Sequence, residues 1–159
     1  MQAEMLKSIV ERGCPFAQDH HMRVVEMAEN GTATMVLDDH PSNYNAFGLI
    51  HAGAICGLVE TTAGMGVFHF LDSPRETVVL NTVLTIRYIA MPTGELRCTA
   101  RVTEAEAEVL MEEFREVGKA DKAVHAKVWD SSGKMVADAQ ATFRIMPTPE
   151  QFQKYFEGM

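Results

Sequence analysis

The sequence is poor in cysteine and has no cysteine pair at a metal-binding or redox spacing. Cys14, Cys56 and Cys98 are odd in number and far apart, so neither a disulfide framework nor a zinc site can be built from them. Free thiols are typical of a reducing compartment, and Glu4 stands where a signal peptide would carry positive charge. We therefore expect a cytoplasmic protein with no metal ion and no cofactor.

Basic residues are also few, with 14 Lys and Arg against 22 Asp and Glu and a formal net charge of -8. A field of this sign repels nucleic-acid phosphates and anionic lipid headgroups, so we expect neither nucleic acid nor a membrane as a partner. The 159 residues, 47% hydrophobic and 23% charged, have the composition of a globular protein. They suffice for one domain with its own core, spanning residues 1–159.

Formal charge is nearly absent from one long segment. Between Asp39 and Asp72 the only charged side chain is that of Glu60. The stretch 46–71 is apolar enough to resemble a membrane span, but polar residues and five glycines interrupt it. We therefore predict a buried core helix over residues 50–68. Its many small residues favour a sheet whose backbone wraps closely around it.

The rest of the chain predicts strands and short helices. A helix is expected over residues 2–12, and strands over 22–27 and 32–37 join through Asn30-Gly31, which is typical of a tight hairpin. Further strands are expected over 77–88, 95–102, 123–129 and 134–144. A capping-box pattern at Thr103 predicts either a helix or a fraying strand over 103–117, and Pro149 opens a helical turn over 149–157. The pattern indicates an α+β domain, an antiparallel sheet of five or six strands around one central helix.

The candidate chemistry lies between Asn45 and Glu60. His51 precedes the central helix, where the backbone N–H groups of Ala52 and Gly53 have no intrahelical partner and can bind an oxyanion or a polarised carbonyl. Glu60 lies roughly 10 Å further along the helix axis, too far to act on the same carbonyl within one subunit. A symmetric dimer would bring Glu60 to the helix terminus of a second chain.

Each of these residues also has a purely structural interpretation. Glu60 could be a solvated side chain at an exposed part of the helix, although its apolar neighbours leave little polar face for that. His51 could be a helix cap, and Asn45 could be a turn residue. The residue pattern alone leaves both interpretations open.

Residues 45–53, N-A-F-G-L-I-H-A-G, followed by Glu60, are similar to the signature of the hotdog-fold acyl-CoA thioesterases. The resemblance is to the branch of the PaaI-like (phenylacetate-pathway) and 4-hydroxybenzoyl-CoA thioesterases, whose pattern reads N-x-x-G-x-x-H-G-G with an Asp or Glu seven residues later. Asn45, Gly48, His51 and Gly53 match, and Glu60 has the matching spacing. Two strand motifs, L-T-I-R-Y-I-A-M-P and W-D-S-S-G-K-M-V-A-D-A-Q-A-T-F, extend the resemblance to residues 22–146.

The resemblance implies a hotdog fold and hydrolysis of an acyl-CoA to the free acid and CoA. Glu60 of a neighbouring subunit would act as nucleophile or as general base on water, and the Ala52 N–H would polarise the thioester carbonyl with Gly53 supporting the helix start. Asn45 would orient water or substrate, His51 would fix the loop or bond near the thioester, and Thr61, Asn81 or Thr82 would contact the substrate. A homodimer is the expected minimal unit, and a homotetramer the expected assembly.

The sequence departs from the family pattern in three places that matter. An Arg is common just before the Pro of the strand motif, and here Met91 precedes Pro92. Ala52 replaces a glycine, which keeps the N–H but adds a methyl group, and residues 103–118 look like an insertion. Two other functions remain as alternatives. A hotdog hydratase or dehydratase is disfavoured because Asn45 stands where a carboxylate would be needed, and Ala46 stands where a histidine fourteen residues before Glu60 would be needed. A non-catalytic acyl-CoA-binding protein would retain the fold without the chemistry.

Overall fold

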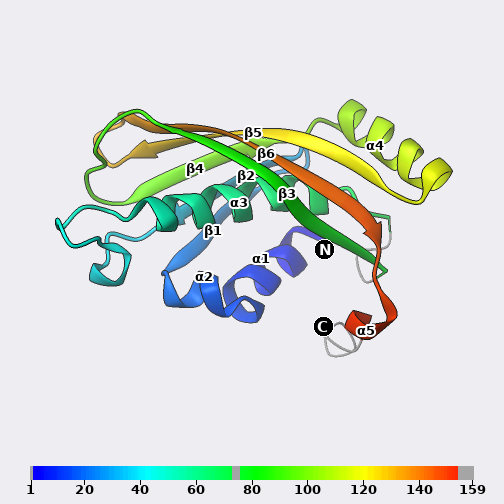
Figure 1. Ribbon diagram of the computed structural model, residues 1–159, viewed down its shortest axis with the longest axis horizontal. Helices are drawn as coiled ribbons and strands as arrows, with labels where there is room; N and C mark the ends of the chain where they lie inside the picture. Colours follow the sequence, from blue (N-terminus) through cyan, green and yellow to red (C-terminus); the bar gives the residue numbers. More distant parts are fainter. Residues whose placement is uncertain (1, 73–75, 154–159) are drawn as a thin grey trace.

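The computed structural model describes residues 2–72 and 76–153, and its centre is the helix α3 (Ala52–Phe68). A six-stranded sheet curves across this helix (Figure 1). In chain order the strands are β1 (Met22–Met27), β2 (Thr32–Leu37), β3 (Thr77–Tyr88), β4 (Leu96–Arg101), β5 (Ala120–Asp130) and β6 (Met135–Pro147). Their order across the sheet is β1-β2-β4-β5-β6-β3, and every neighbouring pair is antiparallel. The predicted α+β architecture is confirmed.

The first hairpin follows the predicted strand boundaries. Its turn needs glycine at position 31, where φ is +79° and an added Cβ would lie 1.9 Å from the carbonyl oxygen of Val102. The Asn30 side-chain oxygen accepts a hydrogen bond from the Thr32 N–H, which closes the turn. Local turn chemistry and a close tertiary approach therefore require the same residue.

The described part of the chain also contains a 3-10 turn at Pro41–Asn43 and four shorter helices. They are α1 (Gln2–Gly13), α2 (Pro15–Asp19), α4 (Glu104–Val117) and α5 (Glu150–Gln153). The predicted helix over residues 2–12 is α1, and the short helix α2 that follows it was not predicted. Pro15 opens α2, because proline is well placed in the first turn of a helix. Segment 103–117 is a helix rather than a fraying strand. Of the predicted turn over 149–157, residues 154–157 lie outside the described residues.

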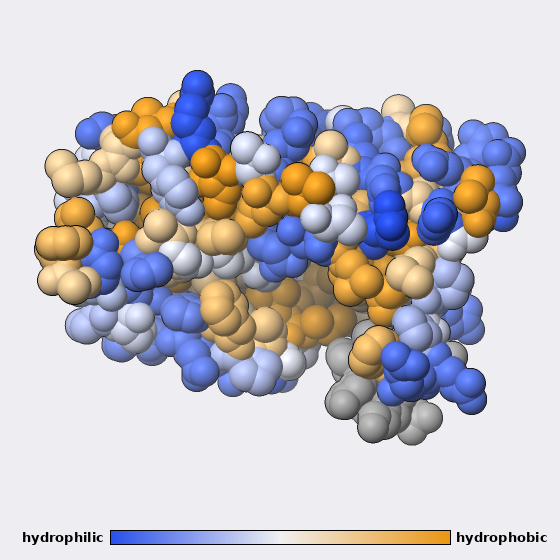
Figure 2. All heavy atoms as spheres, viewed as in Figure 1, coloured by the Kyte–Doolittle hydropathy of each residue, from blue (hydrophilic) through white to orange (hydrophobic). Residues whose placement is uncertain are grey.

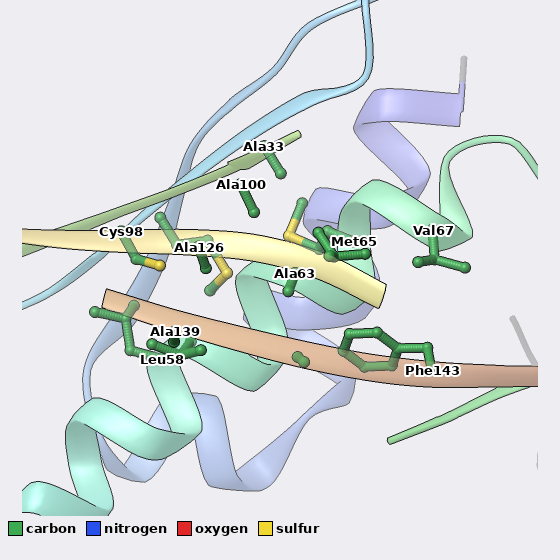
Figure 3. Close-up of a cluster of buried hydrophobic side chains, with 14 of the residues drawn as sticks. Ala33, Leu58, Ala63, Met65, Val67, Cys98, Ala100, Ala126, Ala139 and Phe143 are labelled. Carbon is green, nitrogen blue, oxygen red and sulfur yellow. The ribbon is translucent and has the colours of Figure 1, made fainter. Parts of the chain in front are cut away.

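Small side chains on the sheet allow α3 to lie close to it. Inward-facing alanines come from four strands, and Figure 3 shows them around Leu58 and Ala63 of α3. They are Ala33, Ala100, Ala126 and Ala139. The expectation that the small residues of α3 admit a wrapping backbone holds only in part. Gly57 accommodates the Phe16 ring and Gly64 faces the Phe143 ring. Gly66 does approach backbone, that of Gly31 and Val102 next to the ends of β2 and β4.

The insertion-like segment forms α4 at one end of the sheet (Figure 1). An ion pair of 2.7 Å between Arg115 and Asp72 ties it to the chain that follows the C-terminal end of α3. That end is the far end of α3 from Ala52. Among the described helices, none is both long and apolar enough to cross a membrane.

Candidate functional site

The start of α3 is capped by His51. Its backbone is extended, and its Nδ1 accepts a hydrogen bond of 2.8 Å from the Gly53 N–H. Because Nδ1 is the acceptor, the ring is the neutral tautomer with its proton on Nε2. The side chain is exposed, so this Nε2–H can donate to another group. The cap interpretation of His51 therefore holds, and the cap leaves one donor free.

The Ala52 N–H is the open donor at this terminus. Ala52 is exposed and is the first residue of the helix, and its N–H has no acceptor among the residues that the structure describes. The Gly53 N–H, in contrast, is already bonded to His51, so the prediction that both N–H groups are available needs correction. The Tyr88 hydroxyl donates to the Ala52 carbonyl oxygen at 3.0 Å and fixes the first turn against the end of β3.

Asn43, which the sequence interpretation missed, holds the segment before α3 in place. The residue is fully buried. Its side-chain amide donates hydrogen bonds to the backbone carbonyl oxygens of His20 at 2.9 Å and Asp38 at 3.1 Å. Its backbone carbonyl oxygen accepts a hydrogen bond from the His51 N–H at 2.7 Å. Asn43 thus positions the helix start, but a lone Asn in a Pro-Ser-Asn turn carries no sequence signal for that role.

The side-chain oxygen of Asn45 stabilises the loop before the helix. Its carbonyl oxygen accepts hydrogen bonds from the N–H groups of Phe47 at 2.9 Å and Leu49 at 3.2 Å. With Ala52 and Tyr88 it lines an open groove of about 360 Å³ beside the helix terminus. The interpretation of Asn45 as a turn residue is therefore correct for its side-chain oxygen. Asn45 also lines the groove beside the helix terminus.

Glu60 lines a second and mostly apolar cavity of about 340 Å³. Burial raises the pKa of the Glu60 carboxyl above its usual value of 4.5, and a hydrogen bond from the Thr61 hydroxyl partly opposes that rise. Glu60 is therefore half-buried beside an apolar cavity rather than on a fully exposed part of the helix. Thr61 also lines the cavity, while its hydroxyl donates to the Gly57 carbonyl oxygen at 2.8 Å.

Asn81 and Thr82 lie at an irregularity of β3, where the register against β6 shifts between Asn81 and Val83. Both side chains donate to the Thr142 carbonyl oxygen, at 3.4 Å and 3.1 Å. The strand residues that line the Glu60 cavity are Val79 and Phe143. Within one chain, Asn81 and Thr82 therefore do not join Glu60.

One row of α3 connects the two halves of the site. Ala52, Cys56, Glu60, Gly64 and Phe68 follow one another at intervals of four residues, and none of them is fully buried. Ala52 and Glu60 are thus separated by about 12 Å along the axis. The Glu60 charge contributes to a raised pKa of the Cys56 thiol, after burial as the larger cause.

Strand β3 is a free edge of the sheet, since it pairs with β6 alone among the described strands. Leu80 and Val83 on it are 50% and 57% exposed. Figure 2 shows hydrophobic residues along this edge and, below it, a hollow with a hydrophobic floor. A long apolar edge of this kind is an uncommon surface for an isolated chain. Within residues 2–72 and 76–153, no group of three or more His, Cys, Asp or Glu side chains is placed to hold a metal ion.

Similar folds occur in solved bacterial structures. A protein of unknown function from Pseudomonas aeruginosa, named a probable thioesterase, has a TM-score of 0.81 and 24% identity over 91% of this chain and 95% of its own. A protein of unknown function from Chlorobaculum tepidum has a TM-score of 0.79 and 15% identity over 91% and 94%. A thioesterase from Haemophilus influenzae has a TM-score of 0.70 and 11% identity over 91% and 90%.

The sheet wrapped around α3, together with these likenesses, defines the hotdog fold. Residues 2–145 match the family described as domain of unknown function (DUF4442), and the chain belongs to that family. No curated protein matches the sequence.

Proposed function

We propose that this protein hydrolyses acyl-CoA thioesters to the free acid and CoA, with Glu60 as the catalytic carboxylate. The observation that carries the proposal is the half-buried Glu60 carboxyl in the wall of an apolar cavity, with a pKa raised by burial. Desolvation makes a carboxylate a stronger base and nucleophile, and groups in cavities whose pKa is shifted by burial are typical of active sites.

The second component is the Ala52 N–H at the start of α3. An unpaired N–H at the positive end of a helix dipole stabilises the negative charge that develops on a thioester oxygen during attack. The His51 Nε2–H and the Asn45 side chain lie beside this terminus and supply donors for water or substrate.

Glu60 can promote the reaction by either of two routes, as a general base or as a nucleophile. As general base, Glu60 takes a proton from water while the oxygen attacks the carbonyl carbon, and the tetrahedral oxyanion collapses to release the CoA thiolate, which takes up the proton. As nucleophile, the carboxylate attacks directly, the thiolate leaves, and water hydrolyses the resulting anhydride.

The 12 Å between Ala52 and Glu60 requires a second chain, because a catalytic group must come within hydrogen-bond reach of the atom it serves. We propose a two-fold dimer in which the free β3 edges pair and the α3 rows face each other, so that Glu60 of one chain meets Ala52 of the other. Asn81 and Thr82, on the same edge, would contact substrate only in this assembly. A homotetramer remains the expected larger form.

We choose acyl-CoA as the substrate because of the family resemblance. The same resemblance points to the PaaI-like and 4-hydroxybenzoyl-CoA branch, and it is carried by the spacing of Asn45, Gly48, His51, Gly53 and Glu60. Two of the similar structures are named as thioesterase or probable thioesterase, which agrees with this choice.

The test is hydrolysis of a panel of acyl-CoAs, from acetyl to decanoyl together with benzoyl and phenylacetyl, followed with a thiol reagent. We expect Glu60→Ala to lose about 10²–10⁴-fold in kcat, which is the usual contribution of a positioned acid or base. The matched control is Glu108→Ala, which removes an exposed carboxylate from α4 and should keep full activity.

Full activity of Glu60→Ala on a good substrate would show that the mechanism is wrong. If the wild type hydrolyses none of the panel but binds acyl-CoA in calorimetry, the non-catalytic binding protein is the better description.

A further inference from the structure

Helix α1 forms one wall of the cavity at Glu60, although α1 is not part of the central helix and sheet. Leu6, Ile9 and Val10 of α1 face Gly64 and Phe68 of α3 across it. Among its described lining residues, Glu60 alone carries a charge, and the others are apolar apart from Thr61. Such a cavity recognises a hydrocarbon whose polar end lies at the carboxylate.

The wall formed by α1 is fixed rather than loosely attached. Leu6 and Val10 are buried in the main core. The Glu11 side chain also accepts a hydrogen bond of 2.9 Å from the Val24 N–H, at the irregular part of β1 where the register shifts. The cavity is thus a preformed space whose size depends on the side chains that line it.

The direction of the cavity follows from the row on α3. Gly64 and Phe68 lie one and two turns beyond Glu60, away from Ala52 and the open groove at the helix start. A thioester held at Glu60 would therefore direct its acyl chain along Gly64 towards Phe68. From Glu60 to Phe68 the helix rises about 12 Å, which is the length of roughly eight to ten carbons, because each bond of a zigzag chain advances about 1.3 Å.

Gly64 keeps this path open. A Cβ added there would lie 3.3 Å from a ring carbon of Phe143, which is tighter than ordinary contact. A larger side chain at position 64 would have to project into the cavity. A glycine in the middle of a helix is less favourable than alanine, so the space at Gly64 is obtained at the expense of helix stability.

We propose that the cavity between α1 and α3 is the acyl-chain site and that it takes straight medium-length acyl groups. In this proposal Gly64 keeps the path open and Ile9 limits the length of the acyl chain. This inference rests on the proposed thioester hydrolysis for its substrate. It assigns to α1 a role in specificity, because Ile9 is a half-buried lining residue on the side of α1 that faces the cavity.

The test compares Ile9→Trp, which fills the cavity, and Ile9→Ala, which enlarges it, across acyl-CoAs of two to sixteen carbons. For the wild type, kcat/KM should rise about fourfold per methylene until the cavity is full (about 0.8 kcal/mol each). Ile9→Trp should lose this rise, so that kcat/KM no longer increases with chain length, and Ile9→Ala should move the optimum to longer chains. Lys7→Trp adds the same ring to the exposed side of α1 and should leave the profile unchanged.

A binding measurement separates the cavity from the chemistry. Calorimetry with straight-chain 1-alkanols, which avoid repulsion from the Glu60 carboxylate, should show affinity that increases with chain length in the wild type and is lost in Ile9→Trp. If this holds while no acyl-CoA is hydrolysed, the cavity is a hydrocarbon site and the proposed function fails. If Glu60-dependent hydrolysis is found but Ile9→Trp changes neither chain-length profile nor alkanol binding, the acyl-chain assignment alone is overturned.

Discussion

At Glu60, the stability of the fold and the chemistry of hydrolysis favour different protonation states. The Glu60 carboxyl lies among apolar side chains, and burial raises its pKa. Folding therefore stabilises the protonated form relative to the ionised form, whereas hydrolysis needs the ionised form. At neutral pH the chain keeps a charge in a place where a neutral group would be more stable, which is common at functional sites.

We predict that Glu60→Gln raises the melting temperature while it removes activity. Since the pKa of Glu60 is higher in the folded than in the unfolded chain, its ionisation is destabilising as pH rises through the folded value. Replacing it by the neutral amide should add roughly 1–3 °C to Tm at pH 7, as about 1 kcal/mol corresponds to 2–4 °C in a domain of this size. Thermal unfolding followed by circular dichroism measures the change.

The gain should disappear below about pH 4.5, where Glu60 is protonated in both the folded and the unfolded chain. Glu108→Gln, which neutralises an exposed carboxylate, should show no such gain at any pH. A Glu60→Gln variant less stable than the wild type at pH 7 would mean that the carboxylate makes favourable contacts that outweigh its burial.

The sequence located Glu60 and His51 because charge depletion and helix-start chemistry are local signals. It did not reveal that the Gly53 N–H is already used by the His51 ring, since that bond depends on a rotamer. It also missed Asn43 and Tyr88, whose bonds join segments far apart in the chain. Residue roles that depend on tertiary contacts could not be predicted from one sequence.

At the scale of elements, the boundaries set by local chemistry were predicted well. The Asn30-Gly31 turn and the capping box at Thr103 each specify the start or end of an element through short-range bonds. The short helix at Pro15 was missed because its stability comes from packing. The Phe16 ring, for example, occupies the space left by Gly57.

The capping box of α4 should contribute to the stability of the protein through the charge of Glu106. A hydrogen bond from Lys122 and two from Thr103 lower the pKa of Glu106 to about 2. We expect Glu106→Gln to lose about 0.5–1 kcal/mol of unfolding free energy at pH 7, because glutamine preserves the cap but not the charge at the helix N-terminus or the ion pair. Urea denaturation measures this loss.

The sign of its pH dependence is the opposite of that for Glu60. A lowered pKa contributes stability above the unfolded value of 4.5, and this stability is lost as pH falls towards the folded value of about 2. The gap between wild type and Glu106→Gln should therefore narrow from pH 5 to pH 3. Glu112→Gln, an exposed change in the middle of the same helix, should show no gap that narrows in this way.

The whole molecule contains both components of the proposed site but holds them apart. The Ala52 N–H has no acceptor among the described residues, and Glu60 lies two turns away on the same row of α3. The free β3 edge offers a surface that a second copy would cover. Sequence spacing alone already indicated this separation, because helix geometry fixes it, but the surface that joins two chains depends on the sheet order.

Complementation between two inactive variants tests the shared site. Ala52→Pro removes the N–H but suits the first position of a helix, and the extended backbone of His51 is the conformation that precedes proline. Glu60→Ala removes the carboxylate. We expect each variant alone to be inactive, whereas Ala52→Gly, which keeps the N–H, should remain active.

Co-expression of the two inactive variants in equal amounts should restore activity if each site takes Glu60 from one chain and Ala52 from another. Half of the sites receive an intact Glu60, and half of those face an intact Ala52, so about a quarter of wild-type activity should return. This fraction is the same for a dimer and for a tetramer built from such dimers. A site contained within one chain would recover nothing on mixing, since every chain then carries one defect, and that outcome would contradict the two-chain site directly.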